Sequence, residues 1–259
     1  MNINNVCYIY IKMSNDFFIY PIKKDEDVNT INRIFPEHLP APNFTMLING
    51  SRNSGKSCLL SNLYFKQNCY GQRGKNDKVF QRTIIFSSTL GLDSTSRFIV
   101  EVADDVYNQY DDDVIIELLN FQKKLKKKDR PHILIVLDDI APMMKKRVCA
   151  IWDLFSVHRH YNVSIIVLSQ NLKLVPPIVR NNAVCFIFYK VNSNSELEKI
   201  IEELSFITHK TKILEMYHYA TDTPFCFLMA DAVQNKIYKW GTQNPELLYS
   251  KYSKDGLFN

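Results

Sequence analysis

Glycine and paired cysteines are both scarce in this sequence. Only seven glycines occur in 259 residues, so the backbone has few positions at which it can turn freely into left-handed conformations. The six cysteines, at positions 7, 58, 69, 149, 185 and 226, form no C-x-x-C pair. Most of them lie inside apolar runs, where cysteine behaves as a small core residue. This usage argues against a disulfide-stapled scaffold and favours a reduced intracellular compartment.

The sequence also lacks a membrane-spanning run and a metal-ligand pattern. No apolar run approaches the roughly 18 residues that a transmembrane helix requires, so we expect no membrane span. His158 and His160 are two residues apart with no cysteine or carboxylate near them in sequence, so we expect no structural zinc. The 46% hydrophobic and 23% charged residues are ordinary for a globular protein. A net charge of +5 permits a polyanionic partner without requiring one.

Two of the seven glycines belong to a phosphate-binding motif. Residues 50–57 read Gly-Ser-Arg-Asn-Ser-Gly-Lys-Ser, a full match to G-x-x-x-x-G-K-[ST]. The short apolar run 44–49 before it has the form of a buried parallel strand, and residues 58–65 after it have apolar side chains at helical spacing. The motif therefore lies between a strand and a helix, which is the context of a nucleoside-triphosphate site.

Each part of this loop suits the binding of a triphosphate. Gly50 and Gly55 allow a sharp turn that points successive N–H groups at an anion, and the new helix N-terminus adds a partial positive charge. Lys56 is expected to reach the β- and γ-phosphates, and the Ser57 hydroxyl to ligate Mg²⁺. The predicted cofactors are thus ATP and Mg²⁺, and the predicted nucleotide-binding residues are Gly50, Ser51, Arg52, Asn53, Ser54, Gly55, Lys56 and Ser57.

A second motif places two acids at the end of a buried strand. In residues 132–139, five consecutive large aliphatic residues precede Asp138 and Asp139, which is the Walker B pattern. A central parallel strand delivers such acids to the sheet edge at which ligands bind in open α/β folds. Asp138 is expected to hold the hydration shell of Mg²⁺, and Asp139 to orient or activate the attacking water.

A third apolar strand, residues 162–170, ends on Ser169 and Gln170. The P-loop, Asp139 and Gln170 are predicted to meet at the same sheet edge, where a glutamine amide can hydrogen-bond both the γ-phosphate and the water. The order of these motifs along the chain is similar to that of P-loop ATPases of the additional-strand (ASCE, RecA-like) type. In those proteins a polar sensor ends the strand that lies between the Walker A and Walker B strands. No N/T-K-x-D tetrapeptide, the base-reading motif of GTPases, follows Asp139.

The segment 157–170, with His158-Arg159-His160 before a hydrophobic strand that ends in Ser-Gln, is followed by Arg180-Asn181. This joint pattern resembles the poxvirus-type genome-packaging ATPases of large DNA viruses and virophages, a branch of the FtsK–HerA superfamily. The resemblance covers about residues 44–189. Arg52-Asn53 in the P-loop departs from it, because many members have smaller residues there.

The resemblance implies an α/β fold with a central, mostly parallel sheet flanked by helices. It also implies a ring of identical subunits that hydrolyses ATP with Mg²⁺ and translocates double-stranded DNA into a preformed capsid. Capsid or vertex proteins are then the expected partners, and the virion or a cytoplasmic virus factory the expected location. Hydrolysis between subunits implies an arginine finger from a neighbouring subunit, for which Arg159 and Arg180 are the candidates.

DNA contacts without sequence specificity are predicted at two basic clusters. Such contacts would neutralise phosphates, and binding would weaken strongly with salt. The first cluster stands at the end of a helix that opens at residues 111–113, so its lysines also fit a solvated face that complements the helix dipole. The clusters are Lys123, Lys124, Lys126, Lys127 and Lys128, and Lys145, Lys146 and Arg147.

We expect one ATPase domain over residues 44–242. Residues 1–43 are predicted to be a lead-in, of which 1–12 are dispensable if Met13 is the start. A broken helix is expected over 94–109, a helix over 143–155, a closing C-terminal hairpin over 223–240 and a loose tail over 243–259.

Three other functions use the same motifs. A cellular HerA-type or conjugative DNA pump is expected to have a longer chain with an N-terminal barrel. A small-molecule kinase would transfer phosphate to an acceptor, without stimulation by DNA, and would leave Asp139 and Gln170 without water-directing roles. A nucleotide-gated scaffold would bind ATP without steady-state turnover.

Overall fold

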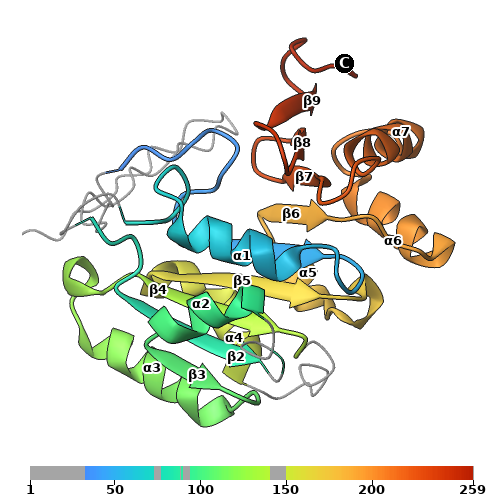
Figure 1. The fold of residues 1–259 in the computed structure, drawn as a ribbon. Coiled ribbons are helices and arrows are strands. Elements are labelled where there is room, and N and C mark those ends of the chain that lie inside the picture. The colour runs from blue at the N-terminus through green and yellow to red at the C-terminus, as the bar shows by residue number, and fades with distance from the viewer. Residues whose placement is uncertain (1–32, 73–76, 88, 90–93, 141–149, 259) are drawn as a thin grey trace, which may run out of the picture.

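The computed structural model describes residues 33–72, 77–87, 89, 94–140 and 150–258. In these residues the chain forms a nine-stranded sheet with helices on both faces (Figure 1). The strands are β1 (Thr45–Asn49), β2 (Arg82–Ser87), β3 (Asp105–Tyr107), β4 (Ile133–Asp138), β5 (Val163–Ser169), β6 (Cys185–Phe188), β7 (Phe227–Asp231), β8 (Lys236–Trp240) and β9 (Glu246–Ser250). The helices are α1 (Lys56–Phe65), α2 (Ser94–Val102), α3 (Asp112–Lys124), α4 (Ala150–Val157), α5 (Pro177–Asn182), α6 (Asn194–Leu204) and α7 (Lys210–Ala220), with short 3-10 turns η1 (Lys127–Asp129), η3 (His158–Tyr161) and η4 (Leu172–Leu174).

The strand order is β3-β2-β4-β5-β1-β6-β7-β8-β9. The first six of these strands pair in parallel, and β7, β8 and β9 continue the sheet with antiparallel pairing. Strand β5, which ends in Ser169, lies between the Walker A strand β1 and the Walker B strand β4. This order confirms the additional-strand architecture predicted from the motifs.

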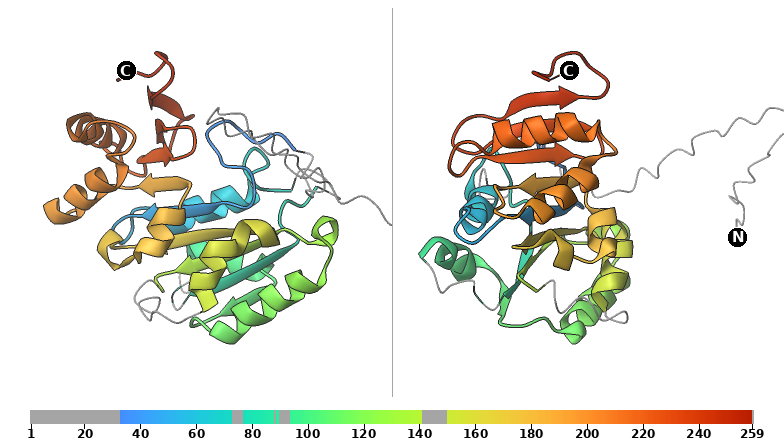
Figure 2. Two further views of the ribbon diagram at one scale, coloured as in Figure 1. Left: turned by 180° about the vertical axis from the view of Figure 1, so that it is seen from behind. Right: turned by 90° about the vertical axis from the view of Figure 1, so that its right-hand side faces the viewer.

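The core consists of two apolar layers, one on each face of the sheet, because side chains along a strand alternate between faces. In β4, Ile135 and Leu137 belong to the layer under α3 and α4, whereas Leu134 and Val136 belong to the layer that includes α1 residues. Both faces of β1, β4 and β5 are fully buried, as their unbroken aliphatic sequences require. The edge-on view separates α1 and α2 on one side from α3, α4 and α5 on the other (Figure 2).

The described part of the lead-in packs against the end of the P-loop helix. Arg33, whose side chain is 2% exposed, donates hydrogen bonds to the carbonyl oxygens of Gly71 (2.9 Å) and Cys69 (2.8 Å), and to that of Gln67. These carbonyls follow the end of α1, where backbone acceptors lack partners within the helix. The lead-in therefore fixes the end of α1 that lies away from the P-loop.

The C-terminal segment corrects one prediction. The tail expected to be loose from residue 243 contains β9, which pairs antiparallel with β8 and buries Leu248 completely. The sequence of this tail is mostly polar and β9 has only a few inward-facing apolar residues, so its alternation of polar and apolar residues is weak. The hairpin of β7 and β8 is as predicted. The division into residues 1–43 and 44–242 stays a prediction, and residues 1–12 lie outside the described part of the chain.

Two helix predictions need new limits. The broken helix expected over 94–109 is helix α2 followed by β3, a short edge strand parallel to β2. The helix expected over 143–155 is seen as α4, from Ala150 to Val157, and residues 141–149 lie outside the described residues. Among the helices described, none is long and apolar enough to cross a bilayer.

Candidate functional site

The P-loop follows β1 and wraps over the start of α1. The N–H of Gly50 donates to the carbonyl oxygen of Ser169, 3.1 Å away, which joins the loop to the sensor strand. A Cβ on Gly50 would meet Tyr189 Cβ at 2.6 Å and Ser54 Oγ at 2.7 Å, so this position has no room for a side chain. Gly55 begins the helix in a left-handed conformation, with φ 104°. The two glycines are thus required by close packing and by backbone geometry, respectively.

Lys56 lies across the mouth of the loop. Its Nζ donates to the carbonyl oxygens of Gly50 (2.8 Å) and Ser51 (3.0 Å), and the residue is 9% exposed. Burial lowers the pKa of this amine, while Asp139 and Asp138 act in the opposite direction. The amine is therefore placed to exchange two carbonyl oxygens for the charged oxygens of a phosphate.

The loop fits an anion in a second respect. Ser54 Oγ is buried and has no hydrogen-bond partner in the described residues, which is a costly state for a hydroxyl group. Arg52 and Asn53, the departure from the family pattern, are both exposed residues. Asn53 takes a left-handed conformation (φ 62°), which asparagine tolerates better than most residues.

Asp138 ends β4 beside the P-loop. Its Oδ2 accepts hydrogen bonds from Ser87 Oγ (2.7 Å) and Thr89 Oγ1 (3.0 Å). Burial raises the pKa of this carboxyl group, and the two hydroxyls counteract it. A buried carboxylate together with the Ser57 hydroxyl is an oxygen donor set of the kind that Mg²⁺ prefers, so these residues fit that ion.

Ser87 and Thr89 were missed in the sequence. Ser87 ends β2, which pairs in parallel with β4 so that Ser87 stands opposite Asp138. In the sequence, the apolar run 84–86 is followed directly by two serines at 87 and 88, and this polar end of an apolar run was the available signal.

Asp139 and Gln170 lie together at the same sheet edge. Gln170 Nε2 donates a hydrogen bond to Asp139 Oδ2, and the N–H of Asp139 donates to the carbonyl oxygen of Leu168 at 3.2 Å. Asp139 has a left-handed backbone (φ 53°), which turns the chain as β4 ends. The structure thus brings together the three predicted elements: the P-loop, the strand-end acids and the sensor glutamine. Their chemical roles stay predictions.

A buried carboxylate that was not predicted from the sequence forms hydrogen bonds to residues at this edge of the sheet. Glu196 Oε1, at the start of α6, accepts hydrogen bonds from Asn49 Nδ2 (3.3 Å) and from the N–H of Leu172. Asn49 is the last residue of β1, and Leu172 follows the sensor strand, so one side chain links both strand ends to α6. Nothing in the local sequence marks Glu196, because its partners are 147 and 24 residues away.

Neither candidate arginine bonds to the P-loop of its own chain in the residues that the structure describes. Arg159 lies on η3, which precedes β5 and so stands at the opposite edge of the sheet, and it is exposed. Arg180, on α5, forms an ion pair with Glu203 and donates to the carbonyl oxygen of Val175 (3.2 Å). In the described residues, neither arginine bonds to the P-loop, Asp138 or Asp139.

The lysine cluster at the end of α3 also lies at the opposite sheet edge. The helix ends at Lys124, just before the chain enters β4 from its amino end, and all five lysines are exposed. Lys126 immediately precedes η1. The cluster, which was predicted at the end of a helix, therefore continues beyond α3. The second cluster, Lys145, Lys146 and Arg147, falls outside the described residues.

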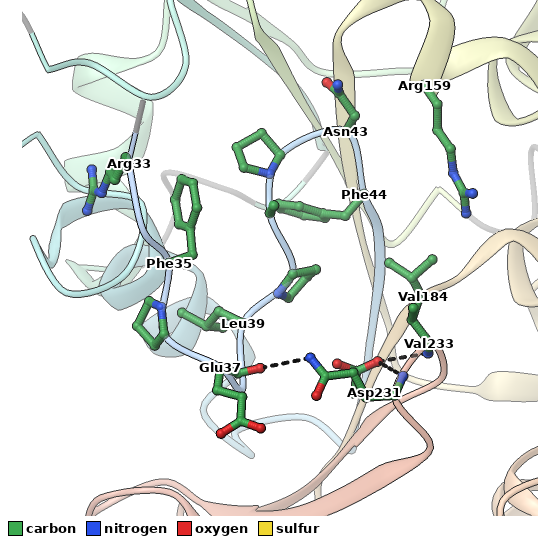
Figure 3. Close-up of a pocket in the computed structure, with 15 residues that line it drawn as sticks. Arg33, Phe35, Glu37, Leu39, Asn43, Phe44, Arg159, Val184, Asp231 and Val233 are labelled. Atoms are coloured by element: carbon green, nitrogen blue, oxygen red, sulfur yellow. Dashed lines mark hydrogen bonds between the residues drawn. The ribbon is translucent and has the colours of Figure 1, made fainter. Parts of the chain in front are cut away.

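A cavity of about 580 Å³ lies at this opposite edge rather than at the P-loop. It is bounded by the proline-rich lead-in, by Arg159 and by the turn after β7 (Figure 3). Asp231 Oδ1 holds that turn by accepting from the N–H groups of Val233 and Gln234, both at 2.8 Å. The lining of this cavity contains neither the P-loop residues nor Asp138, Asp139 and Gln170. Its size therefore does not make it the candidate site.

Comparison with known protein families shows which family the chain belongs to. Residues 32–236, which include the P-loop, both strand-end acids and Gln170, match the family model described as poxvirus A32 protein. The chain belongs to the poxvirus A32 protein family. The resemblance predicted from the sequence is confirmed, and the match extends beyond residues 44–189 at both ends.

Solved structures agree with the A32 assignment on the fold. The DNA-packaging ATPase B204 of Sulfolobus turreted icosahedral virus is 20% identical, with a TM-score of 0.55 over 77% of this chain and 98% of B204. B204 of Sulfolobus turreted icosahedral virus 2, a genome-packaging NTPase solved with ATP-γS, is 21% identical, with a TM-score of 0.53 and coverage of 77% and 98%. The A32-family chain has no significant match among curated proteins.

Proposed function

We propose that this chain is an ATP-driven motor that moves double-stranded DNA into a preformed viral capsid. By its family the protein is a genome-packaging NTPase. The observation that carries the proposal is the meeting of the P-loop, Asp138 and the Asp139–Gln170 pair at one sheet edge. A kinase would leave the last two residues without a water-directing role, whereas an ATP hydrolase needs a group that handles water.

The contacts of each residue support the following division of roles. Lys56 and the loop N–H groups hold the phosphates, and Ser57 and Asp138 would hold Mg²⁺, which neutralises charge on the phosphate oxygens. The Asp139 carboxylate takes the proton of the attacking water. Gln170, hydrogen-bonded to Asp139, orients that carboxylate and senses the γ-phosphate. The relative B204 was solved with ATP-γS, which supports ATP as the nucleotide.

A ring of identical subunits explains the positions of the two arginines. Since neither bonds to its own P-loop in the described part of the chain, we assign both candidates to the nucleotide of a neighbouring subunit. Arg159 is exposed and free to do so, whereas Arg180 must first leave Glu203, with which it forms a pair whose side chains are 16% and 12% exposed. We therefore assign the trans finger to Arg159, with an expected contribution of about 10³–10⁵ in rate.

DNA binding is assigned to the exposed lysines after α3. Their position at the edge opposite the nucleotide separates the DNA-binding surface from the hydrolytic site in each subunit. Contacts with phosphates alone would make binding independent of sequence and strongly dependent on salt. Assembly in the virion or the host cytoplasm, with capsid or vertex proteins as partners, completes the proposal.

The first test is ATP hydrolysis by the purified protein with and without long double-stranded DNA, across a salt series. We expect DNA to stimulate turnover, the stimulation to fade with salt, and Lys56→Ala to abolish activity at every salt concentration. Turnover that ignores DNA at all salt concentrations would contradict translocation and would direct attention to a phosphate acceptor. Binding of ATP without turnover would favour the scaffold function.

The DNA surface has its own control. The variant with Lys127→Ala and Lys128→Ala should lower the slope of log affinity against log salt by about 2, since each lost phosphate contact removes about 0.9. A variant with Lys210→Ala and Lys254→Ala changes charge equally on another exposed part of the protein. An equal effect of both pairs would show that net charge, not this surface, binds DNA.

The ring is tested by mixing subunits. Arg159→Ala and Asp139→Asn proteins should each be inactive, and their mixture should regain activity because some interfaces then combine an intact arginine with an intact acid. A mixture of Arg180→Ala with Asp139→Asn tests the other candidate in the same way. No recovery in either mixture would contradict a trans arginine.

A further inference from the structure

A second cavity opens directly beside the P-loop, between α1 and the antiparallel end of the sheet. Its volume is about 340 Å³, within the range of roughly 300–1,000 Å³ that is common for small-molecule sites. On the α1 side it is lined by Gly55, Cys58, Leu59 and Asn62, which share one face of the helix because each has others of the set three or four residues away. On the other side it is lined mainly by aromatic residues.

Phe225 is the unusual member of that lining. The residue is 60% exposed, although it has the bulk of a core residue. Its backbone is left-handed, with φ 64°, a conformation that is strained for a bulky residue and is rarely kept without a reason. A Cβ placed on Gly55 would lie 3.1 Å from Phe225 Cδ1, so the ring stands against the P-loop itself.

The other aromatic residues of the cavity are supported by one another. The ring centroids of Tyr189 and Phe227 are 5.0 Å apart, and those of Phe227 and Trp240 are 5.6 Å apart. Tyr189 Oη donates to the carbonyl oxygen of Gly55 at 3.4 Å, which ties this group to the loop. The floor of the cavity is therefore a packed aromatic cluster, while the Phe225 ring remains available at its mouth.

We propose that this cavity receives the base and ribose of the nucleoside triphosphate, with the base stacked on Phe225. The inference rests on the proposed function of the P-loop. A triphosphate held by Lys56 and Ser57 has its remaining end beside Gly55, where the cavity begins. An exposed aromatic face is a suitable platform for any base, since every base has a π-face.

The polar groups of the cavity indicate how selective it is. The Asn62 amide N–H₂ is already bonded to the carbonyl oxygen of Cys58 at 2.8 Å, and Thr242 Oγ1 is 3.4 Å from Cys226 Sγ. Recognition thus depends on stacking more than on hydrogen bonds to base edges. ATP and GTP should bind with similar affinity, and tripolyphosphate, which lacks base and ribose, should bind much more weakly.

The test compares ATP-γS with tripolyphosphate as ligands of the full chain. Phe225→Ala should weaken ATP-γS binding by about 5- to 150-fold, the range expected for one stacked base, and leave tripolyphosphate unchanged. Phe225→Tyr should restore the affinity. Phe206→Ala, which removes a comparably exposed phenylalanine between α6 and α7, should change neither ligand.

The outcomes separate this inference from the proposed function. If Phe225→Ala binds ATP-γS as the unaltered protein does, or loses both ligands equally, the stacking assignment is wrong while the P-loop assignment stands. If the unaltered protein binds neither ligand, the nucleotide site itself is wrong and the inference falls with it.

Cys58 gives an independent readout of occupancy. Among the cysteines that the structure describes, Cys58 is exposed and lines the cavity, whereas Cys69, Cys185 and Cys226 are buried. Saturating ATP-γS should slow the alkylation of Cys58 by iodoacetamide at least several-fold, as measured by peptide mass spectrometry, and Phe225→Ala should require more nucleotide for the same protection. Undiminished alkylation at saturation would overturn the placement of the nucleoside.

Discussion

The parallel strands β1 to β6 and the antiparallel extension, residues 223–250, contribute to the candidate site through different chemistry. The parallel part supplies charged groups at the start of α1 and at the end of β4: Lys56, Asp138 and Asp139. Two of these are buried at an energetic cost, since burial lowers the pKa of Lys56 and raises that of Asp138. The extension supplies aromatic rings, above all Phe225 and Trp240, around an apolar cavity.

This contrast indicates that two tasks are divided between two regions of one sheet. Groups that hold and cleave a phosphate chain must be charged and placed at the carboxyl ends of parallel strands. Groups that hold a nucleoside need only present apolar surface. Variants in the parallel part should therefore affect all phosphate ligands, and variants in the extension only those that carry a base.

The largest effect is expected for Lys56→Ala. The Lys56 amine lies over the mouth of the loop, so its loss should remove binding of both ATP-γS and tripolyphosphate and reduce turnover by at least about 10²–10³-fold. Isothermal titration calorimetry and phosphate release measure the two effects. Lys254→Ala, an exposed lysine in the C-terminal segment, is the control. If the Lys56→Ala variant still binds tripolyphosphate, the assignment of phosphate binding to the parallel part of the sheet is wrong.

Asp139→Asn should separate cleavage from binding within the parallel part. Asparagine keeps the shape of the side chain and can still bond to Gln170, but it cannot accept the proton of water. We expect a fall of about 10²–10⁴ in kcat, with the affinity for ATP-γS changed by less than about 3-fold. Asp153→Asn on the exposed side of α4 should have neither effect. A variant that still turns over ATP would move the proton acceptor to another group.

The same contrast explains which parts were predictable from the sequence. The P-loop and the strand-end acids were found because each is a local pattern whose residue spacing fixes its geometry. The position of β5 between β1 and β4 also followed, since Gln170 ends an apolar run of the right kind. These signals need no knowledge of which distant segments touch.

The base-binding cavity could not be predicted in that way. Phe225 and Gly55 are far apart along the chain, and only the pairing of β7 with β6 brings them together. Glu196 and β9 were missed for a similar reason. The hydrogen-bond partners of Glu196 are distant in sequence, and β9 has too few inward-facing side chains to produce a periodic pattern. An exposed phenylalanine before a strand reads as an ordinary loop residue until its neighbours are known.

Phe225 also allows a test of strain in the extension. Glycine adopts φ 64° without a Cβ clash, whereas alanine retains the cost of the left-handed conformation. Phe225→Gly should therefore be more stable to urea than Phe225→Ala by about 0.5–1 kcal/mol, after allowance for the greater freedom of unfolded glycine. Both variants should lose ATP-γS affinity equally. Greater stability of the alanine variant would mean that the conformation is not strained.

The pH dependence of stability tests whether the two regions unfold together. His158, buried beneath β1, lies 3.0 Å from the carbonyl oxygen of Val163 through Nδ1 and 3.3 Å from Thr45 Oγ1 through Nε2. Burial, with the nearby Arg159 and His160 charges, lowers its pKa below the usual 6.5. The unfolded chain therefore takes up a proton as pH falls through 6.5 while the folded chain does not. Stability is complete above that pH and is lost below it, by at most about 1.4 kcal/mol per pH unit.

The two tryptophans report on the two regions separately. Trp152 lies on α4 against the parallel strands, and Trp240 ends β8 in the extension. In the single-tryptophan variants Trp152→Phe and Trp240→Phe, urea unfolding at pH 7.5 and 5.5 should show the same acid shift, because β6 and β7 share main-chain hydrogen bonds and α7 packs against β7 and β8. His158→Gln should reduce the acid-induced loss of stability reported by each tryptophan. The contributions of other titrating groups cancel when this variant is compared with the unaltered His158 protein. A shift confined to Trp152 would show that the extension, with its nucleoside cavity, folds as a separate unit from the strands that hold the phosphates.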